Sequence, residues 1–162
     1  MANAVTTAGM FLKYCVEATA GGGRPSSGYT IIPGVKVIPA IFNDPNMLQS
    51  TPLSAKKNHT YERGLDDSGG AIQITVNDYA AFRTAWNTCV SAYATAKSAN
   101  KAMWFEVAYQ EGSELDSFYF PGEPLPLGFG GADVDSILEN NLNIAPQGDY
   151  IFAAASTGTI SG

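Results

Sequence analysis

Hydrophobic and polar residues alternate along several short stretches of the chain, as they do in β-strands that turn one face toward a core. In the first stretch, residues 10–18, apolar side chains oppose a polar face that includes Lys13 and Glu17. The alternation returns in residues 101–110, where Glu106 belongs to the polar face. Each stretch is expected to form a strand whose polar face meets water.

A further apolar segment, residues 29–41, is rich in β-branched residues but is interrupted by Pro33, Gly34 and Pro39. A proline cannot donate a hydrogen bond to a strand ladder, so prolines are confined to sheet edges and bends. The segment is therefore expected to form short strands at the edge of a sheet.

The period changes after the alternating residues 72–76. Apolar residues then recur at intervals of three and four, at Tyr79, Phe82, Trp86, Val90 and Tyr93. This spacing predicts a helix over about residues 78–98. Asn77 is a plausible N-cap, and Asp78 suits the positive end of the helix dipole.

Residues 133–145 fit two patterns, because Val134, Ile137 and Leu138 could start a short helix or belong to a longer strand. The strand is favoured, since Pro146-Gln147-Gly148 indicates a turn into a last strand over 149–155. Together with a strand at 118, these elements predict one mainly β, α+β domain over residues 1–162. Its expected architecture is an antiparallel β-sandwich with one flanking helix.

Residues 43–60 show no periodicity and are expected to form a long extended loop. Long loops in compact domains are usually functional or disordered. Met47, Leu48 and Leu53 give this loop apolar side chains that a fully solvated loop does not need. The loop is therefore a candidate contact surface.

Charge excludes several classes of function. Only 15% of the 162 residues are charged, and the net charge is −6. An acidic surface repels nucleic acid and anionic membranes, so phosphate binding is disfavoured, although such a surface suits DNA that must pass without sticking.

Cys15 and Cys89 match no metal-site spacing and are expected to be reduced and buried. A secretory signal and a membrane-spanning segment are not expected, which favours a soluble protein made in a cytoplasm.

Candidate chemistry is weak throughout. His59 is the only histidine and has no partner at a catalytic or zinc-site spacing. The acids of Asp66-Asp67-Ser68-Gly69 lack the alternating order of a calcium loop, whereas Asp, Ser and Gly are typical of a turn. We expect a protein that is not an enzyme and has no catalytic residues, metal or cofactor.

The order of segments resembles the N-terminal half of tail tube proteins (major tail proteins) of long-tailed bacteriophages. The resemblance is carried by Ile32 to Pro39, by Thr51-Pro52-Leu53, by Tyr61, by the alternating strand Ile72 to Val76 and by the helix after it. Its most specific marker is a turn composed of Gly64, Leu65, Asp66, Asp67, Ser68 and Gly69. The extra Gly70 and the segment FPGEPLPLGFGG depart from the family, and the C-terminal half matches only in outline.

The resemblance implies a structural subunit of the virion tail, assembled in the bacterial host cytoplasm. Hexameric rings would stack into a hollow tube that conducts DNA, with tape-measure, tail-tip and terminator proteins as partners. Contacts between subunits and rings would involve residues 1–9, residues 156–162 and the 43–60 loop. The loop candidates are Asp44, Met47, Leu48, Thr51, Leu53, Lys56, Lys57 and His59.

Acidic side chains are candidates for lining such a tube. If residues 133–145 form a strand, Asp133, Asp135 and Glu139 would share its polar face, with Glu106 and Glu17 as weaker candidates. The alternative is an ordinary solvated face. Two other functions remain open: a tube subunit of a contractile injection or secretion machine, and a monomeric carbohydrate-binding module that uses Trp104 and tyrosines as platforms.

Overall fold

The computed structural model describes residues 9–42, 45–54, 57–66, 70–109 and 115–156. Within these residues, ten strands and one helix follow one another. They are β1 (Phe11–Val16), β2 (Thr30–Ile32), β3 (Val35–Val37), β4 (Pro45–Gln49), β5 (Tyr61–Asp66), β6 (Ile72–Asn77), α1 (Ala80–Ser98), β7 (Met103–Ala108), β8 (Ser117–Pro124), β9 (Glu139–Pro146) and β10 (Ile151–Ala153).

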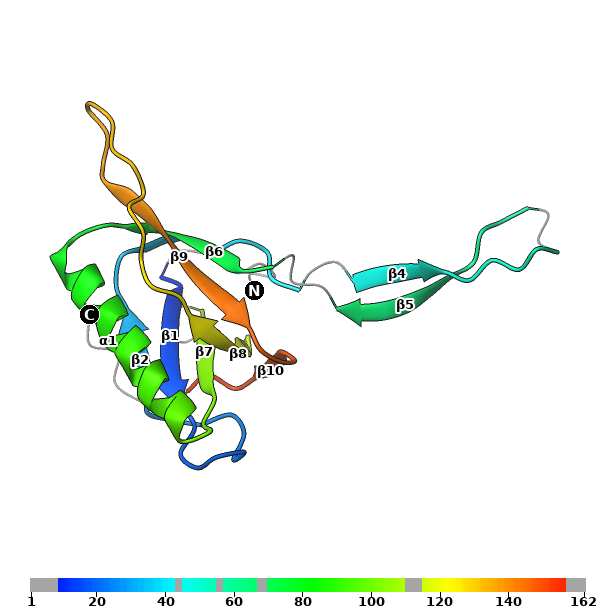
Figure 1. Ribbon diagram of the computed structural model, residues 1–162, viewed down its shortest axis with the longest axis horizontal. Helices are drawn as coiled ribbons and strands as arrows, with labels where there is room; N and C mark the ends of the chain where they lie inside the picture. Colours follow the sequence, from blue (N-terminus) through cyan, green and yellow to red (C-terminus); the bar gives the residue numbers. More distant parts are fainter. Residues whose placement is uncertain (1–8, 43–44, 55–56, 67–69, 110–114, 157–162) are drawn as a thin grey trace, which may run out of the picture.

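The main sheet is antiparallel and curls into a half-barrel (Figure 1). Its strand order is β2-β1-β7-β8-β9-β6-β3, and β10 pairs with β8. Strand β8 allows the sheet to turn, because Phe118–Pro121 pair with β7 whereas Gly122–Pro124 pair with β9. The expected mainly β, α+β fold is confirmed.

The two strands at the ends of this order, β2 and β3, have three residues each and follow each other in sequence. The turn between them contains Gly34 at φ 82°, and a Cβ atom there would lie 2.8 Å from the Tyr79 ring. Glycine tolerates both the positive φ and the close approach. The short edge strands predicted from Pro33 and Pro39 are confirmed.

Helix α1 lies against β1, β2 and β8 and fills the inner side of the curled sheet (Figure 1). Its apolar stripe is buried, and the indole nitrogen of Trp86 donates to the carbonyl of Leu125 at 2.9 Å. The predicted helix is confirmed. Its N-cap is Tyr79 rather than Asn77, and no side chain caps it.

The side chain of Asp78 pairs with Arg83 through two hydrogen bonds of 2.5 and 2.8 Å. The hydrogen bonds from Arg83 hold the pKa of the Asp78 carboxyl below its ordinary value. This pair joins the segment before α1 to the first turns of the helix.

The strand predicted over residues 133–145 begins only at Glu139. Residues 132–138 form neither a strand nor a helix, and Asp135 adopts a positive φ of 59°. Gly131 also has a positive φ, 88°, and strand geometry requires negative values. The apolar pattern through Val134 therefore does not indicate a strand, and Val134 is 84% exposed.

Candidate functional surfaces

A two-stranded hairpin, here called the arm, extends away from the body of the molecule (Figure 1). It consists of β4, β5 and the residues between them, and Met47 lies opposite Arg63 in its register. The expectation of a loop over residues 43–60 was wrong in this part, since β4 is a strand. The hairpin packs on no described core, so neither face needs an alternating apolar pattern, and the sequence gives no strand signal.

The arm exposes large apolar side chains to solvent. Met47 is 52% exposed, Leu48 55%, Tyr61 54%, and Leu53 is fully exposed at 108%. An isolated two-stranded hairpin is marginally stable in water, and clustered exposed apolar residues mark interaction sites. The arm is therefore suited to being covered by another molecule.

Beyond the ends of β4 and β5, hydrogen bonds still join the two sides of the arm. The amide nitrogen of Thr60 donates to the Thr51 hydroxyl at 2.8 Å, and the Gln49 amide nitrogen lies 2.8 Å from Nδ1 of His59. These groups hold the arm in shape and form no catalytic constellation. Lys57 is exposed, whereas Asp44 and Lys56 lie outside the described residues.

The family-marker sequence begins within a strand. Gly64, Leu65 and Asp66 belong to β5, so the expected turn does not begin at Gly64. Asp67, Ser68 and Gly69 lie outside the described residues. Gly70, with φ 95°, leads into β6.

The five acids expected to line a tube divide into two groups. Asp133 and Asp135 are exposed on the loop that precedes β9, and Glu139 at the start of β9 pairs with Lys36. Glu106 is fully buried and Glu17 is 7% exposed, so the expectation that these two carboxylates face a channel was wrong for this chain.

Burial of Glu106 results from segments that cover the outer face of β1 and β7. The Ser156 amide donates to the Glu106 carboxylate at 3.1 Å, and the Tyr119 hydroxyl donates to the Ala154 carbonyl at 2.7 Å. The guanidinium of Arg24 lies 4.4 Å from the centre of the Tyr119 ring. Burial, with Glu106 nearby, raises the pKa of Tyr119 to about 12.

Strands β6 and β9 present a polar face on which Glu139, at the start of β9, is their one charged residue. Gln73 lies opposite Asn143, and Thr75 lies opposite Asn141. The Thr75 hydroxyl donates to the Asn141 side-chain oxygen at 3.2 Å. Alternation placed Gln73 and Thr75 on a polar strand face, but the sequence did not show that β6 and β9 pair to make one surface.

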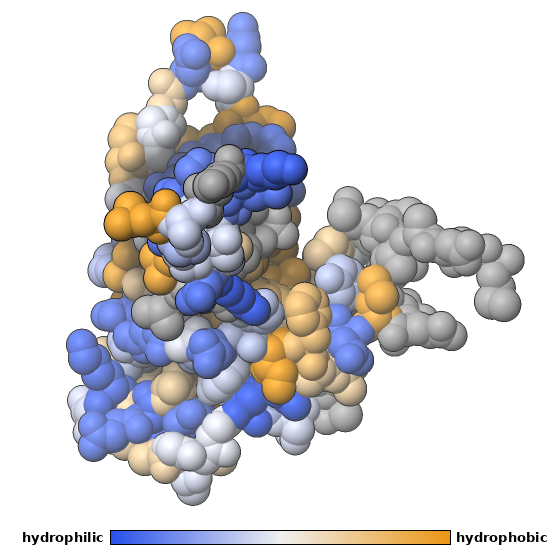
Figure 2. All heavy atoms as spheres, turned by 90° about the vertical axis from the view of Figure 1, so that its right-hand side faces the viewer, coloured by the Kyte–Doolittle hydropathy of each residue, from blue (hydrophilic) through white to orange (hydrophobic). Residues whose placement is uncertain are grey.

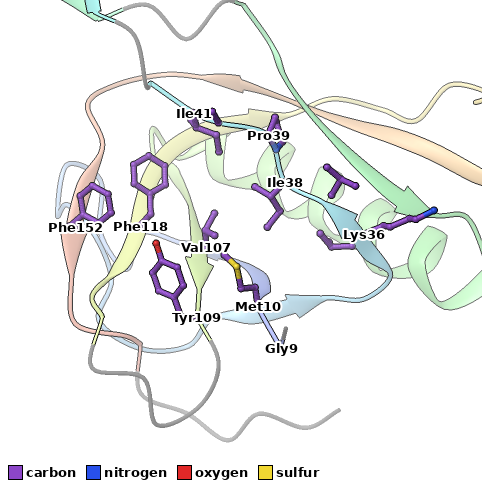
Figure 3. A pocket seen from close by; sticks show the side chains of 13 residues that line it. Gly9, Met10, Lys36, Ile38, Pro39, Ile41, Val107, Tyr109, Phe118 and Phe152 are labelled. Atoms are coloured by element: carbon purple, nitrogen blue, oxygen red, sulfur yellow. The ribbon is translucent and has the colours of Figure 1, made fainter. Parts of the chain in front are cut away.

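An open apolar groove of about 620 Å³ lies beside β3. Met10, Ile38, Val107 and Phe118 extend into it from the segments around it (Figure 3). Lys36 is the one charged residue among the described residues that line it, so these residues offer no acid–base pair for catalysis. It is suited to contact with an apolar surface.

The described residues contain no group of three or more His, Cys, Asp or Glu that could hold a metal ion. Within the same parts of the chain, no helix has the length and apolar character needed to cross a membrane. Cys15 and Cys89 are both free, and burial raises the pKa of the Cys89 thiol to about 12. Cys89 is fully buried as expected, whereas Cys15 is only partly buried.

Comparison with known proteins identifies a similar fold. No protein-family model matches the sequence, and no curated protein matches it. A chain in the cryo-EM structure of the anti-feeding prophage (AFP) baseplate, 6-fold symmetrised, matches the structure with a TM-score of 0.61 and 9% sequence identity. The match covers 97% of this chain and 100% of that chain, so the two share their fold over nearly their whole length.

Proposed function

We propose that this chain is the structural subunit of a bacteriophage tail tube. Copies associate into hexameric rings, and the rings stack into a hollow tube that conducts the DNA genome to the host. The arm carries the proposal, because its exposed Met47, Leu48, Leu53 and Tyr61 require a partner surface to leave water. A subunit with such an arm gains stability by assembling.

Two further features support a tube. The chain that shares this fold comes from a baseplate determined with six-fold symmetry, which fits a ring of six copies. The amide and hydroxyl face of β6 and β9, with Glu139 at one end, is suited to a channel wall, because these two strands offer DNA no positive charge to bind. The net charge of −6 adds a weak general repulsion.

In this proposal the protein acts without catalysis. It occupies the tail of the virion after assembly in the bacterial cytoplasm, and it meets tape-measure, tail-tip and terminator proteins. DNA passes through the tube without specific binding. Joining sheets of neighbouring copies into one barrel would also cover strand edges that otherwise promote uncontrolled pairing.

Negative-stain microscopy of the purified chain tests the proposal. At high protein concentration, and with a tail-initiating complex added, rings or tubes of constant diameter are expected. If only monomers appear under both conditions, the proposal is wrong. A glycan array on the same sample covers the carbohydrate alternative, which would give saturable sugar binding by a stable monomer.

A second candidate is a ring or tube subunit of a contractile injection machine, and the likeness to a chain of the AFP baseplate structure favours it. Counting copies per purified particle by quantitative mass spectrometry separates a tube subunit from a subunit of a single baseplate ring. A tail tube subunit is present in many stacked rings, whereas a single baseplate ring holds one set of copies. A sheath protein in the same particles would favour the contractile machine.

A further inference from the structure

The loop of residues 128–139, here called the acidic loop, combines apolar and acidic side chains on an exposed surface. Phe129 is 77% exposed, Val134 84% and Ile137 74%, and Asp133 and Asp135 are also exposed. Figure 2 shows hydrophobic and hydrophilic residues side by side at the loop tip, which lies at the top of the view. Such a surface is costly in an isolated subunit.

The acidic loop is held in place at its base. The Asn140 side-chain amide donates to the Gly128 carbonyl at 2.8 Å, and a Cβ atom at Gly130 would lie 2.5 Å from the carbonyl oxygen of Glu139. At the tip, the Asp133 carboxylate accepts a 2.8 Å hydrogen bond from the Val134 amide. The surface is thus shaped by specific contacts within the chain.

The arm carries a net positive charge, opposite in sign to that of the acidic loop. The arm, residues 45–66, contains three Lys or Arg, one Glu and one Asp, a net charge of +1, so the rest of the chain carries −7 to give the total of −6. Lys57 lies in this basic segment together with the exposed apolar residues Leu53 and Met47. An apolar basic surface and an apolar acidic surface therefore occur on the same chain.

The two surfaces lie at opposite ends of a strand pair. The arm leads into β6 near Ile72, which pairs with Ile144, whereas the acidic loop leads into β9 at Glu139, which pairs with Asn77 at the other end of β6. Figure 1 shows the arm and the loop extending in different directions. The arm therefore points away from the acidic loop of its own copy.

We propose that the acidic loop is the docking site for the arm of a second copy of this chain. The inference rests on the proposed function and names the surface that receives the arm. Pairing would bury apolar side chains of both elements and set Lys57 against Asp133 and Asp135. Because the donor and acceptor surfaces differ, the contact is heterologous, and its repetition from copy to copy either closes a ring or continues into an open-ended stack.

The apolar groove beside β3 is a weaker acceptor for the arm. Its described lining residues include Lys36 and no acid, so a basic arm would meet a like charge there. Like charges in a contact disfavour association. Charge complementarity therefore selects the acidic loop.

Charge reversal tests the docking site. The readout is the protein concentration at which half of the chain is assembled, measured by sedimentation velocity at low salt. Lys57→Glu and Asp133→Lys are each expected to raise this concentration about tenfold. The double variant Lys57→Glu/Asp133→Lys restores opposite charges between copies. Its concentration of half-assembly is expected to lie within about threefold of that of the unchanged chain.

Matched controls reverse charges outside the contact. Asp149→Lys and Lys97→Glu reverse the charge of exposed residues in the same way. Each is expected to keep the concentration of half-assembly within about twofold of the unchanged chain. If Asp133→Lys behaves like Asp149→Lys, or if the double variant is no better than the single variants, the docking site is wrong even though tubes form. If the unchanged chain never assembles, the proposed function fails together with the docking site.

Discussion

The arm and the outer face of β1 and β7 show opposite relations between polarity and exposure. The arm exposes Met47, Leu48 and Leu53, which are apolar, whereas the outer face of β1 and β7 buries Lys13 and Glu106. In the body, the Ser156 amide bonds to the buried Glu106 carboxylate and helps to cover it. No described part of the chain covers the arm in the same way. The difference shows that the body buries the polar residues of this face by itself, and it supports the proposal that a partner covers the arm.

This contrast separates residues that stabilise the fold from residues that, in our proposal, contact other copies. Substitutions in the body are expected to change the free energy of unfolding. Substitutions on the arm are expected to leave it nearly unchanged and to alter association instead.

The largest expected difference in stability is between Trp86→Ala and Met47→Ala. Trp86 is fully buried and donates to the Leu125 carbonyl, so its loss leaves a cavity and is expected to lower the free energy of unfolding by about 3–5 kcal/mol. Met47 is 52% exposed, and its replacement is expected to change the free energy of unfolding by no more than about 0.5 kcal/mol. Urea unfolding followed by circular dichroism measures both. Equal losses would contradict the division between body and arm.

A smaller difference is expected between Glu106→Ala and Glu62→Ala. Removing the buried Glu106 carboxylate leaves the Ser156 amide without its partner and is expected to cost about 1–3 kcal/mol. Glu62 lies exposed on the arm, and its removal is expected to have little effect. Hydrogen exchange adds a specific readout, since the Ser156 amide should lose protection only in Glu106→Ala. Unchanged protection would show that Glu106 does not hold the C-terminal segment.

The smallest expected effect is the loss of stability in acid that results from the ion pair between Asp78 and Arg83. Hydrogen bonds from Arg83 depress the pKa of Asp78 in the folded chain, so the unfolded chain binds the proton more readily. The stabilisation is full above the unfolded value of about 3.9 and is lost as pH falls through the lower folded value. Asp78→Asn should therefore be less stable than the unchanged chain at neutral pH, and the gap should close in acid. Thermal unfolding from pH 7 to pH 2 measures the gap, and a constant gap would contradict this cause.

The sequence predicted the parts of the fold that local periodicity determines. Alternation located β6, and the stripe of Phe82, Trp86 and Tyr93 located α1, because each of these elements buries one face in the core. The arm was missed because both of its faces are exposed, so burial imposes no alternation on Met47 and Leu48. The loop before β9 was misread because its apolar residues alternate as in a strand, whereas its backbone takes positive φ at Asp135.

The candidate surfaces were predicted less completely than the fold. Met47, Leu48 and Leu53 were recognised from composition, because apolar residues in an aperiodic segment are unexpected. Burial of Glu106 could not be predicted, because the covering residues near Ser156 lie far away in the sequence. The acidic loop was missed as a contact surface, because its complement to the arm depends on where the two elements lie in the folded chain.

Replacing the arm tests most directly whether this chain is a subunit completed by its neighbours. Residues 46–65 would be exchanged for Asn-Gly, a pair that favours a tight turn between Pro45 and Asp66, which face each other in the arm register. Unfolding temperature and negative-stain images of this variant and the unchanged chain would be compared. We expect the same unfolding temperature within about 3 °C and a complete loss of rings and tubes. Normal tubes from the shortened chain, or a body that no longer folds, would contradict the division of the molecule into a complete body and an assembling arm.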